Sequence, residues 1–178
     1  MRDIEGIEDV LGKLRPHWDE IEKHFEHEND QFKALMAEDH DTLGQVLKCH
    51  LIVEHYLDRF LSVHFGIDDI SSVKLSFFQK ARLLPDHASA AAFVKPGILK
   101  LNQIRNQFGH RLRAELHRGQ FGPINEILEV ARNGVHFEEP IDALRAFTTV
   151  ASTFLVVPPP TLQDVFMDAF STVRVHAR

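Results

Sequence analysis

The chain has 178 residues, of which 44% are hydrophobic and 26% charged, and this composition excludes an intrinsically disordered protein. No apolar run approaches the ~18 residues that cross a bilayer, and the first ten residues are too acidic for a secretion signal. The single cysteine, Cys49, excludes an internal disulfide framework and an all-cysteine metal site. We therefore expect one cytoplasmic domain that binds no membrane and needs neither a metal nor another cofactor.

Charge is distributed unevenly along the chain. The net charge of −6 argues against a protein that coats nucleic acid indiscriminately. Residues 1–60 hold 15 acidic and 7 basic residues, whereas residues 61–178 hold 11 acidic and 13 basic residues. The most basic stretch contains Lys100, Arg105, Arg111, Arg113 and Arg118. This local basic patch suits a confined anionic ligand, and the alternative is a solvated helix face.

The sequence predicts helices almost throughout and no strand of any length. An apolar stripe from Ile4 to Leu14 stops before Pro16, and a second stripe runs from Trp18 to Met36 through an acidic helix. Residues 1–40 are therefore expected to form acidic N-terminal helices. The next helix is predicted over 42–65, since Asp41 and Thr42 are capping residues and Gly66 ends it.

Helix 42–65 is apolar almost all round and is therefore expected to be central. Its strongest predicted stripe consists of Leu43, Leu47, Leu51, Leu57, Leu61 and Phe65. Further helices are predicted over 71–84, 96–117, 123–132 and 140–157, with Pro96, Pro123 and Pro140 as starting residues of the last three. After three prolines, residues 161–178 are predicted to form a final helix that docks on its own domain or on a partner.

Helix 96–117 places a charge on its apolar face. Leu101, Ile104, Phe108 and Leu112 form one stripe, and Arg105 falls at its centre. A guanidinium in a core is costly unless an acid meets it, so a buried carboxylate is expected nearby. Glu54 and Asp58 on the central helix are the candidates. The alternative is that such an ion pair merely fixes helix register.

The string Ile104-Arg105-Asn106-Gln107-Phe108-Gly109-His110 resembles the Arg-x4-His signature of the HEPN superfamily, and the resemblance covers residues 42–157. It implies an all-α, up-and-down helical bundle that dimerises across the 96–117 helix. In that family an acid on the second core helix accompanies the motif, and Glu54 or Asp58 occupies the matching place. Many members are metal-independent endoribonucleases. Others, including proteins of the mannitol operon repressor type, are not catalytic.

The motif provides groups for RNA cleavage without a metal. His110 could act as general acid or base, and Arg105 could bind the phosphate, with Asn106 assisting. Lys100, Arg111 and Arg113 are the candidate RNA-binding residues. Residues five apart on a straight helix point about 140° apart, so Arg105 and His110 do not converge unless the helix loosens or two copies pair. Gly109 would permit either solution.

The sequence thus favours an endoribonuclease of a toxin or phage-defence system, controlled by an antitoxin or regulatory protein. The first alternative is a non-catalytic HEPN-type regulator that acts through protein–protein contacts. The second is a helical interaction module in which Arg105 is structural. The sequence alone does not decide between enzyme and regulator.

Overall fold

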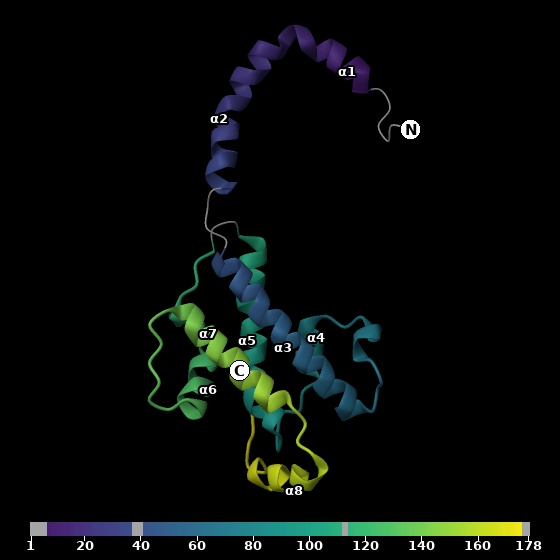
Figure 1. Cartoon of the computed structure of the whole chain (residues 1–178), viewed down its shortest axis with the longest axis vertical. Coiled ribbons are helices and arrows are strands. Elements are labelled where there is room, and N and C mark those ends of the chain that lie inside the picture. Colours follow the sequence, from purple (N-terminus) through teal and green to yellow (C-terminus); the bar gives the residue numbers. More distant parts are fainter. Residues whose placement is uncertain (1–6, 37–40, 112–113, 176–178) are drawn as a thin grey trace. The chain divides into compact units, whose positions relative to one another are not determined.

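The computed structural model describes residues 7–36, 41–111 and 114–175, and these residues form helices, turns and a single isolated bridge between His87 and Arg174. The prediction of an all-α fold is confirmed. The chain divides into two compact units, residues 1–39 and 40–178. Figure 1 shows the elements of each unit, which are described separately below.

The described residues of the first unit form a run of helix. It consists of α1 (Ile7–Leu14), a 3-10 turn η1 (Arg15–His17) and α2 (Trp18–Met36). Pro16 lies in the 3-10 turn, where it separates α1 from α2 as the sequence predicts. None of the side chains described in this unit is buried.

The second unit is built around α3 (Asp41–Phe65), whose predicted bounds are confirmed to within one residue. Gly66 ends the helix with a φ of 64°, a left-handed conformation that glycine adopts without strain. The buried face of α3 differs from the predicted stripe. Val46, Cys49, Val53, Leu57 and Leu61 are buried, whereas Leu51 is 63% exposed and Phe65 is exposed.

The helix predicted over 71–84 is two short helices, η2 (Ile70–Val73) and α4 (Phe77–Arg82). Lys74 adopts a left-handed conformation with a φ of 55° and interrupts the chain between them. Ser76 then starts α4 with a capping box, in which its hydroxyl accepts from the backbone of Gln79 and the Gln79 side chain accepts from the backbone of Ser76.

The helix predicted over 96–117 is α5 (Ala90–His110), which starts six residues earlier and ends seven residues earlier than expected. Ser89 caps its start by accepting a hydrogen bond from the Ala91 N–H, and the alanines that follow have high helix propensity. Pro96 lies inside the helix. At the other end Arg111 is extended, Leu112 lies outside the described residues, and 114–117 are not helical.

Two of the remaining helices match their predictions. α6 (Pro123–Ala131) follows a short 3-10 turn, η3 (Arg118–Gln120), and α7 (Pro140–Leu155) follows an irregular segment. The last helix, α8 (Pro160–Ala169), is shorter than the predicted 161–178. Its tail packs on its own unit, because the Ala88 N–H donates to Val173 O and the Val175 N–H to Asp86 O, each at 2.9 Å.

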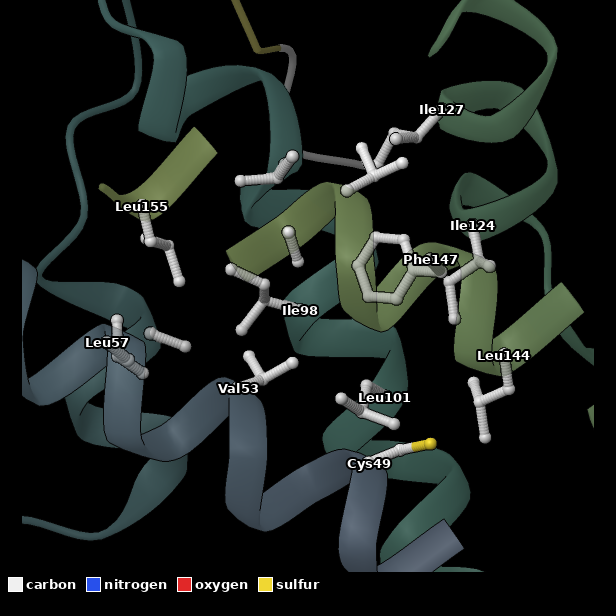
Figure 2. Packing of buried hydrophobic residues seen from close by; sticks show 14 of the residues in the cluster. Cys49, Val53, Leu57, Ile98, Leu101, Ile124, Ile127, Leu144, Phe147 and Leu155 are labelled. Atoms are coloured by element: carbon white, nitrogen blue, oxygen red, sulfur yellow. The ribbon is translucent and has the colours of Figure 1, made fainter. Parts of the chain in front are cut away.

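The core lies where α3, α5, α6 and α7 pack together (Figure 2). α3 and α5 run in opposite senses in Figure 1, as expected for an up-and-down bundle. The labelled core residues of Figure 2 are Cys49, Val53, Leu57, Ile98, Leu101, Ile124, Ile127, Leu144, Phe147 and Leu155.

Gly97 brings α5 close to α7. A methyl group at this glycine would lie 2.6 Å from Cζ of Phe147 and 2.8 Å from Cδ1 of Ile127. The backbone of α5 at Gly97 therefore packs directly against the Phe147 ring of α7.

Within the described residues, no single helix combines the length and apolar composition of a membrane span, and α7 with α8 does so only as a pair bent by 115°.

Candidate functional site

The motif residues lie on the last two turns of α5. Ile104 and Phe108 are buried in the core, so the residues between them are placed along the edge of the packed face. Arg105 is half-buried, whereas Asn106, Gly109 and His110 are exposed. His110 is the last helical residue, and its ring is open to solvent at the point where the chain leaves the helix.

The side chain of Arg105 contacts its own helix. Its Nη1 donates a hydrogen bond to Oδ1 of Asn106 at 3.3 Å. The same nitrogen lies 3.6 Å from the position that a Cβ on Gly109 would occupy, so the guanidinium lies beside Gly109, one residue before His110. The Nε of Arg105 is buried and has no hydrogen-bond partner in the described part of the chain.

The predicted ion pair between Arg105 and Glu54 or Asp58 is wrong. Both carboxylates contact Lys80 instead: its Nζ lies 3.0 Å from Oε1 of Glu54 and 2.8 Å from Oδ1 of Asp58. Among the described residues, no carboxylate lies within ion-pair distance of Arg105. The prediction considered only the two long helices. It left out α4, which packs against both α3 and α5 and contributes Lys80.

Lys80 keeps its charge although its side chain is only 7% exposed. Burial by itself would lower the pKa of this ammonium, but hydrogen bonds and the charges of Asp58 and Glu54 outweigh it and raise the pKa above its usual value. Lys80 therefore neutralises both Glu54 and Asp58. Neither acid forms an ion pair with the Arg105 guanidinium.

His50 lies one turn before Glu54 on α3 and is buried, and sequence reasoning missed it. The ring is buried on α3, stacks on Phe77 with 3.9 Å between ring centroids, and has an Nε2 without a partner among the described residues. Burial lowers the pKa of His50, and the positive charges of Arg105 and Lys80 lower it further, against opposing effects of Asn102 and Glu54. The imidazole is therefore held in its neutral form.

The ion pairs of Lys80 with Glu54 and Asp58 thus join α4 to α3, and the buried His50 lies one turn before Glu54 on α3. The signal for His50 was present in the sequence, since it lies four residues before Glu54 and three before Val53, on the buried face of α3. Lys80 carried no such signal, because α4 is only six residues long.

The basic stretch is less uniform than its sequence indicates. Lys100 lies on α5 and donates to Oε1 of Gln103 at 3.3 Å, and Arg111 is exposed. Arg113 lies outside the described residues. Arg118 is engaged, because its Nη1 donates to Phe137 O at 3.1 Å and its guanidinium lies over the Phe137 ring. Lys100 and Arg111 therefore place positive charge on either side of the motif. The Lys100 ammonium contacts the Gln103 amide, and Arg111 is exposed.

Three surface hollows lie along α3, and neither Arg105 nor His110 lines any of them. The most apolar is lined mainly by Leu47, Leu51, Ile52, His55 and Tyr56 on the outer face of the helix. Asn106, Gly109 and His110 are exposed instead at the end of α5.

No group of three or more histidine, cysteine or acidic residues is placed to hold a metal ion in the described segments. Arg105, His110 and Asn106 thus supply a guanidinium, an imidazole and a carboxamide at the end of α5, with flanking positive charge.

A comparison of the chain with protein-family models, with curated proteins and with solved structures finds no match in any of the three.

Proposed function

We propose that this protein is a metal-independent endoribonuclease whose site is formed by Arg105, Asn106 and His110. The observation that carries the proposal is the environment of Arg105. Its side chain is half-buried, no described carboxylate neutralises it, and its fork lies beside Gly109 at the exposed end of α5. A guanidinium in this position keeps its charge and most of its donors for a phosphate.

The chemistry follows from these groups. The ribose 2′-hydroxyl attacks phosphorus as a base removes its proton, the bond from phosphorus to the 5′-oxygen breaks, and an acid protonates that leaving oxygen. His110 serves as base or acid, because its imidazole can accept or donate a proton and is exposed at the end of α5. Arg105 stabilises the charge on the pentacoordinate phosphate, and Asn106, which accepts from Arg105, orients its fork.

A homodimer through α5 would supply the missing wall of the site. His110 and Arg105 lie five residues apart on the helix, so their side chains leave it in different directions. The Arg105 guanidinium reaches as far as Gly109, one residue before His110. Two copies of α5 packed about a two-fold axis would place the arginine of one chain beside the histidine of the other. Lys100, Arg111 and Arg113 would then contact the RNA backbone on either side.

We place this activity in the cytoplasm, in a toxin or phage-defence setting where an antitoxin or regulatory protein restrains it. The experiment that tests the proposal incubates purified protein with end-labelled single-stranded RNA in EDTA. Cleavage that leaves 2′,3′-cyclic phosphate and 5′-hydroxyl ends is the expected result. Intact RNA across a varied substrate set would contradict it.

Arg105→Lys is the sharper variant for this assay, since it keeps the charge and removes the planar fork. We expect cleavage to fall by roughly 10–100-fold, because Arg105 acts on the transition state through paired donors. Arg132→Lys, an exposed arginine at the end of α6, is the matched control and should cleave like the wild type. Equal loss in both variants would mean that Arg105 has no special role.

The second candidate function is a non-catalytic regulator that binds another protein. The observation in its favour is the outer face of α3, where Leu51 and Ile52 are exposed beside a hollow lined largely by apolar side chains. Exposed apolar patches of this kind mark protein contacts. If RNA stays intact while Leu51→Gln abolishes binding of a co-purifying protein, this function replaces the first.

A further inference from the structure

One of the three hollows along α3 is a cleft between α3 and α7, and the proposed function does not use it. We call it the α3–α7 cleft. The two helices pack against each other and run in the same sense in Figures 1 and 2. The cleft has a volume of about 550 Å³, which is the size of a site for a small molecule. Its polar lining includes Gln45, Lys48 and Tyr56 from α3 and Arg145, Thr149 and Ser152 from α7.

A row of hydroxyl groups on α7 lines this cleft, and one of them has no partner. Thr148, Thr149 and Thr153 each donate to the backbone carbonyl four residues earlier, at 2.9, 3.1 and 2.9 Å. Ser152 lies in the same row and is only 9% exposed, yet its Oγ has no hydrogen-bond partner among the described residues. Buried hydroxyl groups are normally hydrogen-bonded. A partner for Ser152 would therefore come from a molecule in the cleft.

Gln45, which also lines the cleft, has a second unpartnered atom. Its Nε2 donates to the carboxylate of Asp41, and this contact sets the orientation of the amide. Its Oε1 is buried and accepts no hydrogen bond from the described part of the chain. An amide oxygen only accepts, so it requires an N–H or O–H donor. A ligand that carries hydroxyl groups would supply a donor to Gln45 and a partner to Ser152.

Two exposed cations, Lys48 on α3 and Arg145 on α7, complete the polar lining, and no acid among the described residues lines the cleft. Burial raises the pKa of the Cys49 thiol, which also lines the cleft, and a hydrogen bond with Thr148 opposes that rise. The charges of Arg145 and Lys48 also lower this pKa. Because both charges act on the same thiol, they lie close enough to bind one anionic group.

Arg145 has an acidic neighbour outside the cleft lining. Its Nη1 donates to Oδ1 of Asp142 at 3.1 Å, and the two side chains are 56% and 47% exposed. Water screens an exposed pair of this kind, so it contributes little. The hydrogen bond uses one of the five N–H donors of the guanidinium, and a ligand oxygen can bind the others.

The lining favours a phosphate ester over other anions. A phosphate monoester carries a charge of about −1.5 to −2 on one group of three oxygens near pH 7, so both cations can bind the same group. A dicarboxylate divides its charge between two ends. Ser152 lies two turns, or ~10 Å, after Arg145 along α7, so a short hydroxyl-bearing carbon chain would extend from the phosphate toward it. Ile52 and Tyr56 supply apolar surface for that chain.

We propose that the α3–α7 cleft binds a phosphate monoester of a small polyhydroxy compound. Lys48 and Arg145 bind the phosphate, and Ser152 and Gln45 bind the hydroxyl groups. The site is separate from the motif at the end of α5, whose arginine and histidine do not line the cleft. Binding therefore does not depend on RNA cleavage.

The test is isothermal titration calorimetry of the full chain with ribose 5-phosphate and glycerol 3-phosphate. Ribose and inorganic phosphate are the two halves of the first ligand, and succinate is a dicarboxylate of similar charge. We expect ribose 5-phosphate to bind at one site per chain. Ribose, inorganic phosphate and succinate should each bind at least about tenfold more weakly, because each loses a set of hydrogen bonds or one of the two charge contacts.

Two variants locate the site in the cleft. Arg145→Gln should weaken binding of ribose 5-phosphate and of inorganic phosphate by at least about tenfold. Arg132→Gln, at an exposed arginine on the end of α6, is the matched control and should bind like the wild type. Ser152→Ala should weaken ribose 5-phosphate by about 2–10-fold and leave inorganic phosphate unchanged. It should not lower the melting temperature of the free protein, because the hydroxyl it removes has no partner.

Four results would overturn the proposal. The first is that neither phosphate ester binds at about 10 mM. The second is that ribose, inorganic phosphate or succinate binds as tightly as ribose 5-phosphate. The third is equal loss in Arg145→Gln and Arg132→Gln, and the fourth is a Ser152→Ala variant that binds ribose 5-phosphate like the wild type. RNA cleavage is measured separately and affects only the proposed function.

Discussion

The ammonium of Lys80 lies 2.8 Å from a carboxylate oxygen of Asp58, and this contact joins the short helix α4 to the central helix α3. Lys80 also binds Glu54, one turn earlier on the same helix, at 3.0 Å. One buried cation therefore serves two acids, and Arg105 on α5 is left without either of them.

Replacing Lys80 with methionine should destabilise the second unit by about 2–4 kcal/mol. The substitution keeps the volume of the side chain and leaves two partly buried carboxylates without a cation. The partial exposure of those acids places the loss below that of a fully buried pair. Urea unfolding measures it, with Lys48→Met, an exposed lysine on α3, as control. A loss equal to the control would contradict the account of this ion pair.

The buried imidazole of His50 should make stability depend on pH between about 7 and 5. Its folded pKa lies below the ordinary value of 6.5, so the unfolded chain takes up a proton more readily, and stability falls as pH drops through this window. His50→Gln should flatten that dependence. Thermal unfolding at stepwise pH measures it, with the exposed His55→Gln as control. A wild-type protein as stable at pH 5 as at pH 7 would argue against a neutral, buried His50.

The contact between Gly97 and Phe147 predicts opposite effects for two glycine substitutions. Gly97→Ala forces the Phe147 ring to move and should cost about 1–3 kcal/mol. Gly44→Ala, on the exposed side of α3 with open space around it, should raise stability by up to about 1 kcal/mol through helix propensity. Denaturant midpoints measure both. A neutral Gly97→Ala would mean that α5 and α7 are less closely packed at this point.

The bounds of α3 could be predicted because local chemistry sets them: Asp41 and Gly66 mark its ends. Its buried face could not, since the helix is apolar nearly all round and periodicity does not distinguish Leu51 from Val53. For α5, Pro96 was a misleading start signal, because Ser89 and three alanines begin the helix earlier. Local signals thus predict that a helix forms and, where its capping residues are recognised, where it ends, whereas tertiary contacts decide which face is buried.

The candidate site was predictable in part for the same reason. Arg105, Asn106 and His110 lie close together in sequence, and the structure places them on the last turns of one helix. The prediction of an acidic partner for Arg105 was wrong. The positions of α3, α4 and α5 decide whether Glu54 and Asp58 pair with a lysine or with an arginine, and the sequence does not give those positions. Lys80 belongs to a six-residue helix whose sequence has no period long enough to orient it.

The endoribonuclease proposal is tested most directly at His110, by a single comparison of rates. His110→Ala should lower the initial rate of RNA cleavage in EDTA by about 10²–10⁴-fold, the usual contribution of a general acid or base. His117→Ala is the matched control, since His117 is also exposed in the basic stretch and its imidazole lies 3.1 Å from the exposed Glu115 carboxylate. The account predicts that the control cleaves at the wild-type rate. Cleavage by His110→Ala as fast as by His117→Ala would contradict it.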